Sequence, residues 1–112
     1  MMKCSASLEK NIAMRYKLRY LPAADLDLME IDEQLSQFPV KASKFFSLLD
    51  KQASKLKDTP LMYPVYDDVP LYRKMVVLDY LVFYIVNEAK KNVDVHRVIN
   101  GRMDVKKQLT AQ

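Results

Sequence analysis

The run from Tyr80 to Val86 constrains the fold of this chain most, because its seven residues are all apolar or aromatic. A strand with one face in water alternates apolar and polar residues, so an unbroken run of this length predicts a central strand covered on both faces. The run is much shorter than the roughly 20 residues of a membrane-spanning helix. Strands are also expected at 72–77 and 93–99, with a bulge near His96 and Arg97, where the alternation shifts.

The first half of the chain shows one strand pattern followed by two helix patterns. Residues 14–20 alternate apolar with basic side chains, which predicts a strand with one face of each kind. Pro22 fits the first turn of a helix, and Pro39 is expected to end that helix. A second helix is expected over 40–58, antiparallel to the first. The apolar stripes are Ala24, Leu28, Ile31, Leu35 and Phe38 in the first helix, and Ala42, Phe45, Phe46, Leu49, Ala53 and Leu56 in the second.

The predicted fold is α+β, in the order β-α-α-β-β-β. The N-terminal helical hairpin is expected to pack on one face of a small, mainly antiparallel sheet, and Asp104 is expected to cap a short C-terminal helix. Residues 14–112 form a single predicted domain. Residues 1–13 show no apolar period and are expected to be an N-terminal extension, disordered or a short helix, with Met14 as an alternative start.

Composition excludes several kinds of chemistry. Gly101 is the only glycine, so the chain cannot form a glycine-rich loop of the kind that binds phosphate. His96 and Cys4 are the only histidine and cysteine, which argues against a zinc site and excludes a disulfide within the chain. We therefore expect no metal and no cofactor. A lone cysteine suits a reducing cytosol, and no apolar run is long enough to cross a membrane, so a cytoplasmic location is expected.

Positive charge is concentrated toward the C-terminal strands. Residues 71–112 carry eight Lys or Arg against four acids, whereas the expected helical hairpin is mildly acidic. Arg73, Arg97 and Arg102 lie on or beside the expected strands, and the guanidinium fork matches phosphates and carboxylates. Modest basicity is by itself weak evidence for nucleic-acid binding.

The order of elements, with particular residues, resembles the RelE/ParE superfamily of toxins from type II toxin–antitoxin (plasmid stabilisation) systems. The similarity covers nearly all of Met14 to Leu109. The matching pieces are Pro22-Ala23-Ala24-Asp25-Leu26, Leu56 with Pro60, Tyr72-Arg73, Phe83-Tyr84, and Val93 to Asp104, which ends in Asn100-Gly101-Arg102-Met103-Asp104. The resemblance implies a toxin that inhibits growth and pairs with a cognate antitoxin protein in a hetero-oligomer.

The resemblance offers two mechanisms. Members of the RelE type cut messenger RNA on the ribosome with clustered basic and aromatic side chains. Members of the ParE type have a longer helical hairpin, lack that cluster and poison DNA gyrase. This chain has Leu81 where the nuclease members usually carry an arginine, and no aromatic residue after Asp104. These departures favour gyrase poisoning over ribosome-dependent mRNA cleavage, and they leave an inactive relative or a basic RNA-binding module as further alternatives.

The candidate site residues follow from the same resemblance, in which Arg73 and Arg102 match basic positions of the family. A nuclease would use Arg73, His96 and Arg102, since only His96 titrates near neutrality. Target or phosphate binding would use Arg73, Arg97, Arg102 and Lys106. Structural roles compete with these: Arg97 could pair with an acid of the hairpin, and His96 could simply be hydrogen-bonded.

Overall fold

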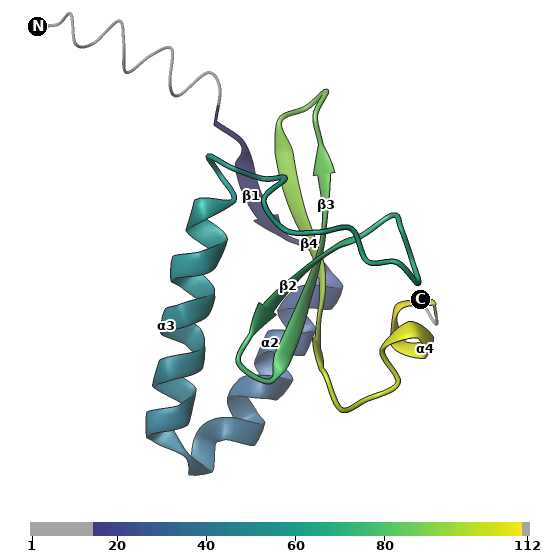
Figure 1. The fold of residues 1–112 in the computed structure, drawn as a ribbon. Helices are drawn as coiled ribbons and strands as arrows, with labels where there is room; N and C mark the ends of the chain where they lie inside the picture. Colours follow the sequence, from purple (N-terminus) through teal and green to yellow (C-terminus); the bar gives the residue numbers. More distant parts are fainter. Residues whose placement is uncertain (1–14, 111–112) are drawn as a thin grey trace, which may run out of the picture.

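The computed structural model describes residues 15–110 and shows a helical hairpin beside a four-stranded sheet (Figure 1). The expected extension over residues 1–13 lies outside the described residues. The elements are β1 (Lys17–Tyr20), α2 (Pro22–Gln34), the 3-10 turn η1 (Leu35–Gln37), α3 (Pro39–Lys55), β2 (Arg73–Val77), β3 (Tyr80–Asn87), β4 (Asn92–Asn100) and α4 (Val105–Thr110). This order confirms the predicted α+β arrangement.

The sheet has the order β1-β4-β3-β2, so the N-terminal strand lies beside the last one. β1 is parallel to β4, and the other two pairings are antiparallel, so the sheet is mixed but mainly antiparallel. The predicted bulge is confirmed at His96. Phe83 pairs with Arg97 and its neighbour Tyr84 pairs with Val95, which leaves His96 as the extra residue of β4.

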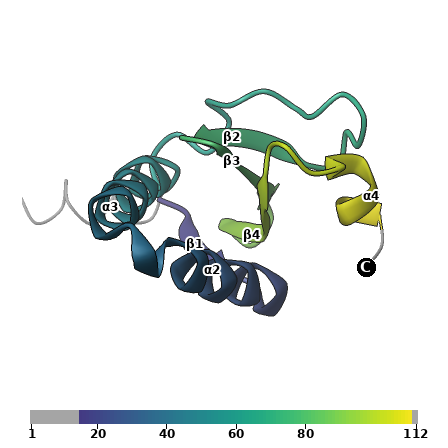
Figure 2. The ribbon, with the colours of Figure 1, turned by 90° about the horizontal axis from the view of Figure 1, so that it is seen from below.

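The two helices cover one face of the sheet, as Figures 1 and 2 show. Pro22 and Pro39 each stand in the first turn of a helix, where a missing N–H costs nothing. The first helix ends at Gln34, before the η1 turn, and not at Pro39 as expected. Because this turn breaks the helical period, the prediction that Phe38 belongs to the apolar stripe is wrong: its side chain is 56% exposed.

The central strand β3 is covered on both faces, as the run Tyr80–Val86 predicted. Val82 and Tyr84 belong to the main core, between the sheet and the helices. Phe83 points to the other face, into a second cluster with Tyr72, Ile99 and Leu109. The loop that leads from α3 to β2 and the short helix α4 cover this second face (Figure 2).

Tyr84 ties the core to the loop after α3. Its side chain is fully buried, and its hydroxyl donates to the Pro60 carbonyl oxygen at 3.0 Å. Burial raises the pKa of Tyr84 to about 12, from an ordinary value of 10.0. A pKa raised by folding stabilises the folded state fully below pH 10, and that contribution is lost as the pH rises toward 12.

Replacing Tyr84 by phenylalanine is therefore expected to flatten the fall in stability between pH 10 and 12, because the variant has no phenol to ionise there. Urea unfolding of both proteins at a series of alkaline pH values measures the difference. An identical fall in the two proteins would assign it to Tyr20, Tyr66 and Tyr80, whose pKa values burial also raises.

Candidate functional site

Arg73 lies on the face of the sheet that the helices cover. It stands directly opposite Tyr84, and its Nη1 donates a 2.7 Å hydrogen bond to the Tyr63 carbonyl oxygen. Burial raises the pKa of Tyr84, and the Arg73 guanidinium opposes that rise because a positive charge favours the phenolate. The half-buried Arg73 therefore fixes the loop before β2, on the face away from the second cluster.

Arg97 joins three elements. Its Nε and Nη2 donate to both carboxylate oxygens of Asp27 in α2, at 2.7 and 3.1 Å, and its Nη1 donates to the Gln108 carbonyl oxygen of α4 at 3.1 Å. Asp27 also accepts the backbone N–H of Val98 at 2.9 Å. β1 ends at Tyr20, opposite Val95, so this carboxylate supplies the acceptor for one backbone N–H of β4 beyond the end of β1.

The Arg97–Asp27 pair is largely withdrawn from solvent, with side chains 15% and 14% exposed. The hydrogen bonds to Asp27 raise the pKa of Arg97 above its ordinary value. Arg97 therefore forms the ion pair with an acid of the hairpin that was expected as its structural role. A role for Arg97 in binding a target stays a prediction.

His96 stands at the β4 bulge and is half-buried. Its ring meets the edge of Tyr72, with ring centroids 5.3 Å apart at an interplanar angle of 69°. Burial lowers the pKa of His96, and Asp94 opposes that shift. The ring is therefore mostly uncharged at neutral pH and packs against an aromatic of the second cluster.

Arg102 lies in the turn between β4 and α4 with an exposed side chain. Its backbone N–H donates to the Asn100 side-chain oxygen at 2.9 Å, and within residues 15–110 its guanidinium has no hydrogen bond or ion pair. The predicted cap of α4 is confirmed, because Asp104 accepts the N–H of Lys107 at 3.2 Å. Lys106 lies in α4, and its side chain is outside the part of the chain that the structure describes.

Lys74 is a cation of the second face and was not among the candidates predicted from the sequence. It stands opposite Phe83, and its Nζ lies 5.5 Å from the centroid of the Tyr66 ring. Met75 and Val77 are buried on the helix side, so strand alternation alone would have placed Lys74 on the other face. Leu81 shares that face and is half-buried.

The candidate catalytic residues do not form one cluster. Cleavage of RNA needs a proton acceptor and a charge stabiliser within reach of the same phosphate. Arg73 is on the helix side, His96 packs against Tyr72 on the opposite side, and Arg102 follows the end of β4. Arg73 and Arg102 are further separated along β3, by the four steps from Tyr84 to Tyr80, or about 13 Å. Residues 15–110 also contain no group of three or more metal-ligating side chains.

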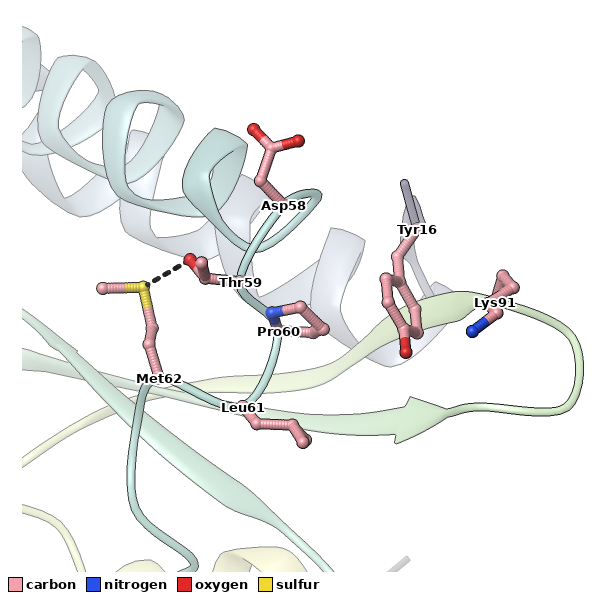
Figure 3. Close-up of a pocket in the computed structure, with 7 residues that line it drawn as sticks. All are labelled: Tyr16, Asp58, Thr59, Pro60, Leu61, Met62 and Lys91. Carbon is pink, nitrogen blue, oxygen red and sulfur yellow. Dashed lines mark hydrogen bonds between the residues drawn. The ribbon is translucent and has the colours of Figure 1, made fainter. Parts of the chain in front are cut away.

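An open cavity of about 570 Å³ lies where β1 meets the end of α3 (Figure 3). Tyr16 forms one wall, with the Lys91 Nζ 5.0 Å from its ring centroid. Pro60, Leu61 and Met62 form the opposite wall. A second cavity of about 480 Å³ follows β1, lined by Arg15, Tyr16, Lys17, Leu18, Arg19 and Lys57. This end of the molecule thus combines apolar surface with several cations.

Sequence comparison identifies the family. The model of the ParE toxin family, from type II toxin–antitoxin systems (parDE), matches residues 18–105. The chain therefore belongs to the ParE toxin family, within the superfamily that its sequence resembles. A search of the curated proteins finds no match.

Solved structures share the fold. The toxin–antitoxin system described as chromosomal ParDE from P. aeruginosa matches with a TM-score of 0.64 and 18% identity, over 78% of this chain and 97% of that one. A RelBE toxin–antitoxin complex from Mycobacterium tuberculosis matches with a TM-score of 0.57 and 17% identity, over 77% and 98% of the two chains. No helix in the described part of this chain is long and apolar enough to span a membrane.

Proposed function

We propose that this chain is the toxin of a toxin–antitoxin pair and arrests growth by binding DNA gyrase, without cutting RNA. The observation that carries the choice between mechanisms is the separation of Arg73, His96 and Arg102 onto different parts of the fold. Loss of a single preorganised donor typically slows a reaction about 10²–10³-fold, so a site without an assembled cluster would cleave poorly. Arg102, exposed and free of internal partners, is the candidate of this set best placed to contact a target.

The proposed partner is an acidic antitoxin segment that lies along β1. This strand is at the edge of the sheet, and the exposed side chains in it and just before it are all cations: Arg15, Lys17 and Arg19. Arg19 is paired with Asp94 at 2.8 Å and Arg15 with Asp58 at 3.0 Å, whereas Lys17 has no ion pair among the described residues. An extended acidic segment can add to a free strand edge and also meet such cations. The two solved neighbours are both described as toxin–antitoxin systems or complexes.

Brief induction of the chain in a bacterial host tests the mechanism. We expect growth arrest, unchanged 5′ ends of translated messages, and inhibition of purified gyrase. Arg102→Ala is expected to weaken the arrest, because it removes a charge that the fold does not use internally. Lys90→Ala is the matched control, since Lys90 is also exposed and lies in the turn between β3 and β4, away from Arg102.

Three outcomes would count against the proposal. Harmless high-level expression of the untagged chain would exclude a working toxin. Cleavage of translated messages at a fixed position within their codons would establish the mRNA-cleaving alternative, provided that gyrase is unaffected. An arrest equally sensitive to Lys90→Ala and Arg102→Ala would show that net charge matters and that Arg102 has no particular role.

A further inference from the structure

Exposed apolar side chains gather at the end of the molecule where both hairpins turn. Phe38 and Val40, at the turn between α2 and α3, are 56% and 82% exposed. Val76 and Leu78, at the turn between β2 and β3, are 51% and 38% exposed. The two turns lie at the same end in Figure 1, and Lys41 links them through an ion pair to Asp79, with a Nζ–Oδ2 distance of 3.8 Å. Val76 pairs with Leu81 and points to the sheet face away from the helices, so we call only Phe38, Val40 and Leu78 the hairpin-end surface.

Leu78 is held in a backbone conformation that does not suit it. Its φ is 54°, in the left-handed region that glycine adopts freely and branched or bulky side chains avoid. The turn is also held in place, because the Asp79 carbonyl oxygen accepts the N–H of Gly101 at 2.9 Å. A Cβ built at Gly101 would stand 3.3 Å from that oxygen, so a larger residue there would require the turn to shift by a few tenths of an ångström. Leu78 is thus a strained, partly exposed apolar residue on a fixed turn, a combination that favours a role in binding.

The edge of β2 beside this surface is open for half its length. Pro64 and Val65 cover the first half, where Lys74 donates its N–H to the Pro64 carbonyl oxygen at 3.0 Å and Val65 bridges to Arg73. Among the described residues, no other segment forms a backbone hydrogen bond or a bridge with the outer edge of β2 after Lys74. Edge strands are usually protected by charged side chains, as β1 is by its row of cations. Val76 and Leu78 give the β2 edge no protection of that kind.

We propose that the hairpin-end surface docks onto a protein target, at an apolar hollow beside a carboxylate. One exposed cation without an internal partner stands beside this turn, Arg102, which follows the Gly101 that hydrogen-bonds to Asp79, and it suits a carboxylate on the partner. Two of the three surface residues are aliphatic and offer no ring for a base to stack on, and a single unpaired cation cannot follow a phosphate backbone. This inference rests on the proposed function, because it names the surface through which the toxin reaches its target.

Leu78→Gly separates binding from folding. Glycine accepts a φ of 54° without strain, which offsets the lost leucine contacts and the added freedom of the unfolded chain, so the variant is expected to melt within a few degrees of the wild type and to keep its antitoxin. Its affinity for the target is expected to fall roughly tenfold or more, because an apolar anchor is lost. The readouts are thermal melting, copurification with the antitoxin, and the expression level that arrests growth. Val40→Ser provides a second variant, on the other turn, at a position 82% exposed.

Leu61→Ser is the matched control. Leu61 is 50% exposed and lines the cavity beside Tyr16, at the opposite end of the molecule. Weakened arrest by Leu78→Gly and Val40→Ser, with full arrest by Leu61→Ser, supports the inference. Full arrest by both hairpin-end variants, or equal weakening by Leu61→Ser, overturns it and leaves the proposed function standing. A wild-type dimer in light scattering that Leu78→Gly dissociates would assign the surface to a second copy instead. A wild-type chain that does not arrest growth ends both proposals.

Discussion

Asp27→Ala is expected to lower the free energy of unfolding by about 3 kcal/mol, because it removes the carboxylate from a largely covered ion pair and leaves charged and backbone donors without an acceptor. The variant leaves the Arg97 guanidinium only 15% exposed and without its carboxylate. It also leaves the Val98 N–H at the β4 edge without an acceptor. For a domain of this size the loss corresponds to a fall in melting temperature of well over 10 °C.

Asp25→Ala provides the control for this measurement. Asp25 is on the same helix as Asp27, in its first turn, but is exposed. Its loss is expected to cost a few tenths of a kcal/mol, the usual value of a single acid near a helix N-terminus. Urea unfolding of the three proteins gives the comparison. Equal stability of Asp27→Ala and Asp25→Ala would show that the Arg97 junction contributes no more than a surface charge.

Phe45→Ala is expected to destabilise the fold by a similar amount, about 3–5 kcal/mol, because it leaves a cavity under the helical hairpin. Phe45 is completely buried, and its ring centroid lies 5.0 Å from that of Phe46 and 4.8 Å from that of Tyr80. The ring therefore joins α3 to the central strand β3. Chemical unfolding measures the loss, with the slope against denaturant reporting whether the fold stays cooperative.

Phe38→Ala makes the matching phenylalanine control. Phe38 is 56% exposed at the turn between the helices, so its replacement is expected to change stability by no more than about 0.5 kcal/mol. Phe38 and Phe45 were both expected on the apolar stripes of the two helices. A large destabilisation by Phe38→Ala would mean that the stripe continues through the turn after all.

Local pattern was sufficient to predict the order of elements. The apolar run of β3, Pro22 in the first turn of α2, and the alternation in β4 each reflect a constraint within a few neighbouring residues. The bulge at His96 and the cap at Asp104 were predictable for the same reason, since a shifted period and a capping carboxylate are visible in a short window. Phe38 was misplaced because the period alone did not reveal the η1 turn.

The sequence by itself thus determined the fold class, the family resemblance and the residues from which a site could be built. Only the tertiary structure decided which of those residues meet. Strand register put Arg73 opposite Tyr84 on the helix side and Lys74 opposite Phe83 on the other side. The return of α2 along β4 brought Asp27 to Arg97 across 70 positions of the chain. The physical reason is that contacts between distant residues depend on how whole elements pack, and a shift of one residue in a strand moves each side chain to the opposite face.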